Sequence, residues 1–159
     1  MKNKIVRGVF FGCILSLVIS CNQQPATPVV DKDQIKKDIQ TKENEFADLY
    51  NKGELKDIGY YADDATTFFP NRAPLVGKDS IVSFLKNDLI SNTDKLSFNT
   101  NEVFVSNDGN QVLEVGYFKL VDSSNAVINT GNYMSLFEKR NDKYVCVRDM
   151  SASDMPAKN

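Results

Sequence analysis

The stretch YYADDATTFFP, at positions 60–70, decides how this chain is built. Its two tyrosines end a short predicted helix, and its two aspartates are expected to form the turn that follows. Residues 66–69, TTFF, combine β-branched and aromatic side chains, which favours a short strand, and Pro70 ends that strand. The next loop leads through the sequence LVGK, at positions 75–78, into another amphipathic helix.

Apolar spacing and turn residues predict the other elements. A first helix begins near Gln34, carries one apolar stripe with Glu43 on the polar side, and stops at Gly53. The predicted helices cover residues 34–52, 54–61 and 78–90, and four later strands cover residues 95–106, 111–121, 127–139 and 144–151. The sequence therefore predicts an α+β domain, with three N-terminal helices packed on one face of a curved antiparallel sheet.

This order of elements resembles the nuclear transport factor 2-like superfamily, which includes ketosteroid isomerases and SnoaL-like polyketide cyclases. The most specific parts of the resemblance are YADDAT, at positions 61–66, and LVGK, at positions 75–78. It covers about residues 34–154 and implies a cone-shaped domain, with its mouth between the first helix and the concave side of the sheet. The superfamily contains enzymes and proteins without a known reaction, so the fold alone assigns no function.

The N-terminus has the pattern of a bacterial lipoprotein signal. Basic residues precede an apolar run at positions 9–19, which is too short to span a bilayer but suits a signal peptide. The sequence VISC, at positions 18–21, resembles the lipobox, whose cysteine becomes lipid-modified and starts the mature chain. The alternative is an ordinary secretory signal with a chance cysteine. We expect a signal peptide over residues 1–20, lipid on Cys21, a tether over residues 21–33 and the domain over residues 34–159.

This signal predicts a location in the bacterial cell envelope, with the membrane as a partner through lipidated Cys21. The diacyl or triacyl form of a lipoprotein anchors stably, whereas one acyl chain binds a membrane only marginally. No aspartate follows Cys21. We therefore expect the outer membrane, on the side that faces the periplasm, rather than the inner membrane.

Composition excludes several kinds of site. The chain has no histidine, which excludes a Ser-His-Asp triad, a Cys-His dyad and a histidine-rich metal site. Removing the basic residues Lys2, Lys4 and Arg7 of the signal peptide from 19 leaves 16 against 21 acidic residues. This acidic balance disfavours nucleic acid as a partner. No cofactor or metal ion is expected, and Cys146, between two valines, is expected to be a buried, inert thiol.

The resemblance also locates the positions of ketosteroid isomerase chemistry. That enzyme uses a carboxylate base, together with a tyrosine and a protonated aspartic acid that hold the enolate oxygen. Counted from the shared motifs, the base falls on Phe69, the tyrosine on Phe46 and the acid on Tyr133. Two of these positions are apolar and the third is a phenol. We therefore identify no catalytic residue, and steroid isomerisation is disfavoured.

The family register predicts the lining of a ligand pocket. The residues expected to converge inside the cone are Phe46, Phe69, Tyr133, Arg148 and Met150. They would provide an apolar wall, one phenolic hydroxyl and one permanent cation. This combination suits a small amphipathic molecule with an anionic or carbonyl oxygen.

Two roles for Arg148 stay open. A charged side chain on the concave side of the sheet needs a partner. That partner is either a carboxylate of the Asp63–Asp64 pair, which makes Arg148 structural, or an anionic ligand. Asp149 follows Arg148 and is expected to point to the opposite side of the strand.

Two functions of different classes fit this pocket. In the first, the lipid-anchored domain is a binding module that holds a small amphipathic ligand or meets another envelope protein. In the second, it is a SnoaL-like isomerase, cyclase or hydrolase that acts on a hydrophobic substrate. The first is favoured because no competent base is visible, and a carboxylate in a deep apolar cone would favour the second.

A homodimer is expected. Residues 111–121 and 144–150 carry apolar side chains at both strand parities, whereas a sheet with one wet face would alternate more cleanly. Members of the superfamily commonly pair through the convex side of the sheet, which would cover the second apolar face.

Overall fold

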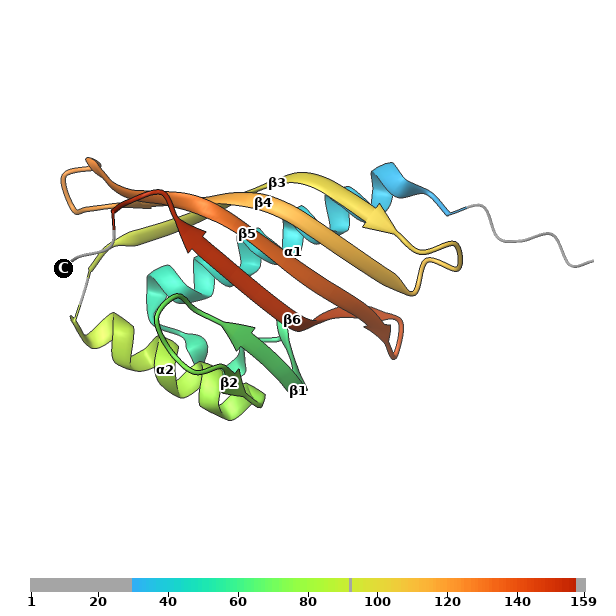
Figure 1. The fold of residues 1–159 in the computed structure, drawn as a ribbon, viewed down its shortest axis with the longest axis horizontal. Helices are drawn as coiled ribbons and strands as arrows, with labels where there is room; N and C mark the ends of the chain where they lie inside the picture. The colour runs from blue at the N-terminus through green and yellow to red at the C-terminus, as the bar shows by residue number, and fades with distance from the viewer. Residues whose placement is uncertain (1–29, 92, 157–159) are drawn as a thin grey trace, which may run out of the picture.

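The computed structural model describes residues 30–91 and 93–156, which form two α-helices and a six-stranded sheet (Figure 1). The elements are α1 (Lys32–Lys52), the 3₁₀ turn η1 (Leu55–Asp57), β1 (Tyr61–Phe68), β2 (Leu75–Val76), α2 (Lys78–Ser91), β3 (Lys95–Val105), β4 (Gln111–Val121), β5 (Val127–Arg140) and β6 (Lys143–Ser153). The predicted signal peptide, Cys21 and most of the predicted tether lie outside the described residues. In the part that is described, no helix is long and apolar enough to cross a membrane.

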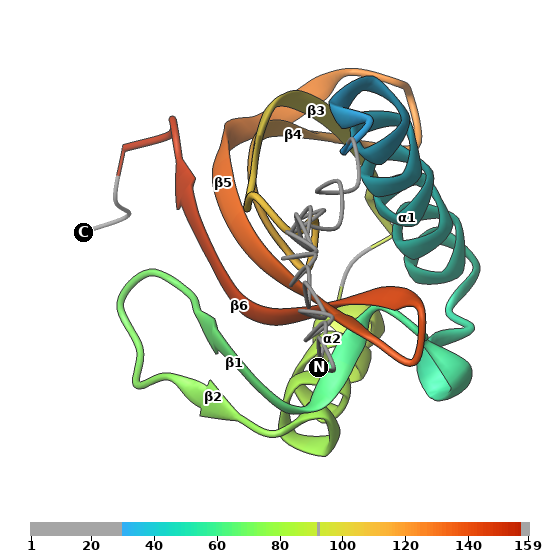
Figure 2. The same ribbon diagram turned by 90° about the vertical axis from the view of Figure 1, so that its right-hand side faces the viewer.

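The sheet curves around a hollow that the two helices help to close. Its strand order is β2-β1-β6-β5-β4-β3. Figure 2 shows β6, β5, β4 and β3 as a curved wall, with α1 along one side and α2 near β1. Helix α1 packs mainly against β3, and α2 packs mainly against β1. The predicted α+β class and the curved sheet are confirmed.

Local signals set both ends of α1. The Asp31 carboxylate accepts a hydrogen bond from the Gln34 amide at 2.9 Å, so the helix begins at Lys32 rather than near Gln34. At the other end, Gly53 adopts the left-handed conformation, with φ of 73°, and its N–H donates to the Tyr50 carbonyl at 2.9 Å. The predicted stop at Gly53 is confirmed.

The predicted helix over residues 54–61 is wrong, so two α-helices replace the expected three. Only the single turn η1 forms there, and its apolar Leu55 is fully buried. Strand β1 already begins at Tyr61, which places the two aspartates of the predicted turn inside the strand. The Tyr60 carbonyl accepts a hydrogen bond from the Cys146 amide at 2.8 Å, so this backbone is used for sheet pairing.

Strand β1 also changes the type of sheet. It pairs in parallel with β6 and antiparallel with β2, so the sheet is mixed rather than antiparallel throughout. The amide of Gly77, which has φ of 86°, donates to the Ala65 carbonyl at 2.8 Å. This bond ties the LVGK segment to β1, and the predicted helix after that segment is confirmed as α2.

A β-bulge at Val147 reverses the side-chain parity of β6. The pair Phe137–Cys146 is followed by the pair Leu136–Arg148, which leaves Val147 as an extra residue. Cys146 is a buried free thiol, as predicted, and Val147 is buried beside it. Because side chains alternate along a strand, one extra residue moves every later side chain to the other face. Arg148 therefore turns outward, and the residue after it turns inward.

Candidate functional site

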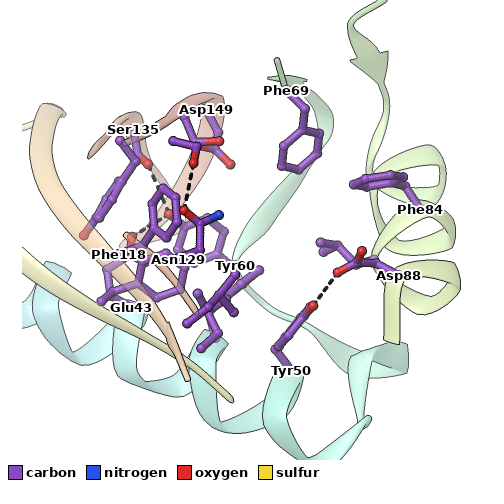
Figure 3. Close-up of a pocket in the computed structure, with 18 of the residues that line it drawn as sticks. Glu43, Tyr50, Tyr60, Phe69, Phe84, Asp88, Phe118, Asn129, Ser135 and Asp149 are labelled. Atoms are coloured by element: carbon purple, nitrogen blue, oxygen red, sulfur yellow. Dashed lines mark hydrogen bonds between the residues drawn. The ribbon is translucent and has the colours of Figure 1, made fainter. Parts of the chain in front are cut away.

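The hollow contains a cavity of about 360 Å³ between the helices and the concave face of the sheet (Figure 3). Aromatic rings dominate its wall. The apolar and aromatic lining residues are Phe46, Tyr50, Tyr60, Tyr61, Phe69, Pro70, Phe84, Leu85, Leu96, Phe98, Phe118, Leu120 and Tyr133. The polar lining residues are Glu43, Asp88, Asn129, Ser135, Asp149, Ser151 and Ser153. Such a cavity is typical of a pocket for a small, largely apolar molecule.

Phe46, Phe69 and Tyr133 line the cavity, in the positions that the sequence predicts. The predicted positions of Arg148 and Met150 are wrong, because both side chains are exposed on the outer face of the sheet, Met150 by 53%. The prediction extended a regular alternation through β6, and the bulge breaks that alternation. Whether any of the lining residues binds a ligand stays a prediction.

Arg148 lies beside Asp64, one of its expected partners, but contacts its main chain rather than forming a salt bridge, and it does not line the cavity. Its guanidinium donates to the main-chain carbonyls of Val147 and Asp64, the latter at 3.4 Å. The carboxylate of Asp64 instead accepts two hydrogen bonds from Arg140, and Arg140 also donates to Glu138 at 2.8 Å. Arg148 is therefore part of the outer surface, where its charge helps to lower the pKa of Asp64, and it does not line the cavity.

Two glutamates are buried at one end of the cavity. Glu43 of α1 is 1% exposed and lines the cavity, and Glu114 of β4 is fully buried behind it. The Tyr60 hydroxyl donates to Glu43 Oε1 at 2.5 Å. The hydroxyls of Thr100 and Tyr133 both donate to Glu114 Oε1, at 2.6 and 2.8 Å. Glu114 Oε2 receives no hydrogen from an amide or hydroxyl of the described residues.

A proton on Glu43 completes this network. Burial raises the pKa of Glu43 well above its ordinary value, and the neighbouring Glu114 raises it further. Burial also raises the pKa of Glu114, but hydrogen bonds from Thr100, Glu43 and Tyr133 oppose that rise. Two adjacent buried carboxyl groups do not both ionise at low cost. We therefore place the proton on Glu43, which donates it in a hydrogen bond to Glu114.

Asp149 brings a third carboxyl group to the cavity, from β6 (Figure 3). It pairs with Ser135 across the β5–β6 ladder. Its Oδ2 accepts hydrogen bonds from the Tyr61 hydroxyl at 3.0 Å and the Thr67 hydroxyl at 2.9 Å. Burial raises the pKa of Asp149, and these hydrogen bonds partly oppose the rise. We call Glu43, Glu114 and Asp149 the carboxyl cluster.

The opposite wall of the cavity is aromatic and comes from α2 and the loop after β1. The Phe69 and Phe84 ring centres lie 4.8 Å apart, and the Arg72 guanidinium carbon lies 4.0 Å from the Phe84 ring centre. The Tyr50 hydroxyl donates to Asp88 at 2.5 Å. In Figure 3, Phe69, Phe84 and Asp88 stand across the cavity from Glu43 and Asp149.

The carboxyl cluster has no basic partner among the described residues. No lysine or arginine lines the cavity in residues 30–91 and 93–156. The ion pairs of this part of the chain lie elsewhere: Lys139–Asp142, Arg140–Asp64 and Arg140–Glu138. In the same residues, no three His, Cys, Asp or Glu side chains converge in a way that could hold a metal ion. The ionisable groups that line the cavity in the described residues are therefore carboxyl groups and phenols.

Sequence reasoning missed both Glu43 and Asp149. A signal for Glu43 was present, because it lies four residues after Ile39 and three before Phe46, on the buried stripe of α1. For Asp149 the local sequence held no signal. Its inward position depends on the bulge at Val147, which is a property of strand pairing.

Comparisons with known proteins agree with this architecture. The chain is similar to an NTF-2 like protein of unknown function from Shewanella oneidensis MR-1, with 23% identity, a TM-score of 0.62 and coverage of 74% of this chain and 98% of that chain. It is also similar to a ketosteroid isomerase-like protein from Erwinia carotovora atroseptica SCRI1043, with 14% identity, a TM-score of 0.61 and coverage of 78% and 99%. The chain has the nuclear transport factor 2-like fold. No protein-family model and no curated protein matches it.

Within the nuclear transport factor 2-like fold, this chain places its polar groups differently from a ketosteroid isomerase. The positions that the resemblance assigns to the isomerase base and tyrosine are Phe69 and Phe46, which form apolar wall. The Tyr133 hydroxyl already donates its hydrogen to Glu114. The carboxyl groups that line the cavity are instead Glu43, Asp88 and Asp149.

Proposed function

We propose that the domain binds a small, largely apolar molecule in the cavity, with Asp149 as a polar contact. The observation that carries this proposal is the cavity itself, with a volume of about 360 Å³, an aromatic wall and a carboxyl group at one end. Aromatic rings supply a large rigid contact area, and a single polar group orients the ligand. The anionic site expected from Arg148 is withdrawn, because that residue lies outside the cavity.

A pair of substitutions on β6 tests this proposal. Ser151 lines the cavity, and the adjacent Ala152 is exposed on the other face. We expect Ser151→Leu to fill part of the cavity and weaken binding of the neutral dye Nile red, and Ala152→Leu to leave binding unchanged. Fluorescence titration measures the affinities, and mass spectrometry of the purified chain identifies any molecule that copurifies. Equal dye binding by the wild type and Ser151→Leu would contradict a ligand in this cavity.

An enzyme is the second candidate, and Asp149 supports it. A general base works best when its pKa lies near the operating pH and it reaches the proton to be removed. Burial raises the pKa of Asp149, and the group lines an apolar cavity. Such a carboxylate would remove a proton from a carbon next to a carbonyl group of a hydrophobic substrate, as an isomerase or a cyclase does.

Deuterium exchange tests this second candidate. Indanone has an enolisable carbon and fits the apolar character of the cavity. If Asp149 is the base, the wild type should accelerate exchange at that carbon in heavy water, and Asp149→Asn should lose about a hundredfold of the acceleration. Asp48→Asn, an exposed aspartate on α1, is the matched control. Exchange no faster with the wild type than in buffer would count against the enzyme.

We propose that the domain is held in the bacterial cell envelope through lipid on Cys21. The proposal is supported by the basic start, the short apolar run and the VISC sequence at positions 18–21. Metabolic labelling with a fatty-acid analogue should mark the wild type and miss Cys21→Ser. Equal labelling of the two proteins would exclude this anchor, and fractionation of the labelled membranes tests the outer membrane against the inner one.

We propose that two copies pair through the convex face of the sheet. Phe68, Met134 and Met150 are 41%, 40% and 53% exposed on that face. Met150 is the ladder partner of both others, so the three side chains form one apolar patch. We expect Met134→Glu to lower the mass seen by light scattering from dimer to monomer, and Met155→Glu, outside the sheet, to leave it unchanged. A monomeric wild type would contradict the proposal.

A further inference from the structure

The three tyrosine hydroxyls that contact the carboxyl cluster each donate their hydrogen to one of its carboxyl groups. Tyr60 donates to Glu43, Tyr133 to Glu114 and Tyr61 to Asp149. A hydroxyl carries one hydrogen, so none of these three can donate to a ligand while it keeps its carboxyl partner. These three hydroxyls are therefore not available to hold a carbonyl or anionic oxygen.

The same end of the cavity retains capacity to accept hydrogen bonds. A carboxylate offers about four lone-pair sites. Asp149 uses two of them for Tyr61 and Thr67, both at Oδ2, and Ser135 lies within hydrogen-bonding reach. At least one site is left for a donor that comes from the cavity. A ligand that binds at this acceptor site must therefore carry a hydrogen-bond donor.

The charge of the cavity lining also favours a ligand that donates hydrogen bonds. Among the described residues, no lysine or arginine lines the cavity, and Asp149 is the lining carboxylate that carries this argument, since Glu43 holds a proton. A buried carboxylate without a positive partner is costly, and a cation that enters the cavity removes much of that cost. An anion beside Asp149 would meet like charge and no lysine or arginine of the described lining.

The aromatic wall completes a site for a cation. The Tyr60 and Tyr61 ring centres lie 4.8 Å apart, both rings line the cavity, and Tyr61 contacts Asp149 directly. The faces of aromatic rings attract ammonium groups, and desolvation strengthens the attraction. An apolar amine can place its ammonium group at this end and its chain or ring against the remaining wall.

We infer that the cavity takes a small apolar amine, whose ammonium group lies against Asp149 and the rings of Tyr60 and Tyr61. This inference rests on the ligand-binding function proposed above and names the chemical class of its ligand. It reverses the class expected from the sequence, which was an amphipathic molecule with an anionic or carbonyl oxygen.

Three probes of the same shape and different charge test the inference. Phenylbutylamine is cationic at neutral pH, phenylbutanol is neutral and phenylbutyrate is anionic. Calorimetric titration of the full chain should give an affinity for the amine about ten- to a hundredfold above that for the alcohol, since a hydrogen bond to a charged group contributes this much. Phenylbutyrate should bind weakest.

Two variants locate the charge preference. Asp149→Asn keeps the size of the side chain and should bring the affinity for phenylbutylamine close to that for phenylbutanol. Asp48→Asn removes the same charge from the exposed face of α1 and should leave the preference unchanged. Thermal melting shows whether each variant is folded. If Asp149→Asn does not fold, the order of the three probes on the wild type still decides the question.

The possible outcomes separate this inference from the proposed function. Equal binding of the three probes, or tighter binding of phenylbutyrate, would overturn the amine site and leave ligand binding standing. A preference for the amine that Asp149→Asn retains in full would overturn the role of Asp149. Binding of none of the three would contradict the amine site and the ligand-binding function together.

Discussion

The two faces of this sheet hold acidic side chains in opposite ways. On the convex face, Asp64 and Glu138 are paired with Arg140 at the surface. On the concave face, the carboxyl cluster is held by tyrosine and threonine hydroxyls, with no basic residue among the described ones. The hydrogen bonds from Arg140 lower the pKa of Asp64, whereas burial raises the pKa values of Glu43 and Asp149.

This difference indicates that the concave face carries the candidate function. The surface carboxylates have their counter-charge within the chain, so they need nothing from outside. On the concave face, Glu43 holds a proton, whereas Asp149 keeps an acceptor site without a donor, has no basic partner among the described residues and lines the cavity. A carboxylate that lacks a counter-charge within the chain marks a site where a ligand can supply one.

The largest difference between the faces should appear when one carboxylate is removed from each. Glu114→Ala leaves Glu43, Thr100 and Tyr133 without their shared acceptor, so we expect it to lower the free energy of unfolding by about 3 kcal/mol or more. Asp64→Ala removes an exposed partner and should have a far smaller effect. Urea denaturation measures both variants, and equal losses would contradict the contrast.

A glycine beneath Tyr133 gives a sharper, intermediate test. A Cβ atom at Gly116 would lie 2.3 Å from Tyr133 Cζ and 2.4 Å from its hydroxyl oxygen, so the buried ring must move away from Glu114. We expect Gly116→Ala to cost about 1–3 kcal/mol. At Gly59 an added Cβ meets nothing within 4 Å, so Gly59→Ala should change stability by less than about 0.5 kcal/mol. Thermal melting of both variants checks the pair.

The pH dependence of stability should also separate the faces. The pKa of Glu43 is raised in the folded state. Its contribution to the free energy of unfolding is therefore fully present below the ordinary glutamate pKa of about 4.3, and it is lost as the pH rises through the folded pKa. One such group lowers the free energy of unfolding by at most about 1.4 kcal/mol per pH unit in that window. Surface aspartates with lowered pKa values, such as Asp64 and Asp108, act in the opposite sense and only below about pH 4.

Glu43→Gln is the variant that tests this assignment. Glutamine can accept from Tyr60 and donate to Glu114, as the protonated acid does. We expect the variant to fold and to lose the larger part of the decline in stability above about pH 4.3. The exposed Glu45→Gln is the matched control on the same helix and should keep the decline. An unchanged decline in Glu43→Gln would place the proton elsewhere.

The smallest expected effect belongs to the surface ion pairs. Added salt screens exposed charges, with a Debye length of about 3 Å at 1 M. Asp64→Asn should therefore differ slightly from the wild type at low salt and not at all at high salt. If the stability difference between Asp64→Asn and the wild type persisted in molar salt, the Asp64–Arg140 pair would not be an exposed, screened ion pair.

Much of the fold could be predicted because its signals are local. Gly53 ends α1, Gly77 begins α2 and the Asn- and Asp-rich turns separate the long strands, each through conformations that those residues favour. The helix over residues 54–61 could not be excluded in this way. Its apolar spacing suits a helix, but the backbone of Tyr60 pairs with β6, and that contact is remote in sequence.

The candidate site was harder to predict because one residue sets its polarity. The pattern around Cys146 allows either parity for the residues that follow. The bulge at Val147 decides between them, and it depends on the ladders with β5 and β1. A regular strand would have put Arg148 in the cavity and suggested an anion. The actual strand puts Asp149 there and suggests a cation.

The central claim is that Asp149, and not Arg148, faces the cavity. Isotope-edited NMR of the side-chain carboxyl carbons, recorded across a pH titration of the wild type, tests it most directly. We expect Asp149 to titrate above the ordinary aspartate pKa and Asp64 to titrate below it, as burial and pairing with Arg140 dictate. If Asp149 titrated at or below the ordinary value, alongside Asp64, the contrast between the two faces would be wrong.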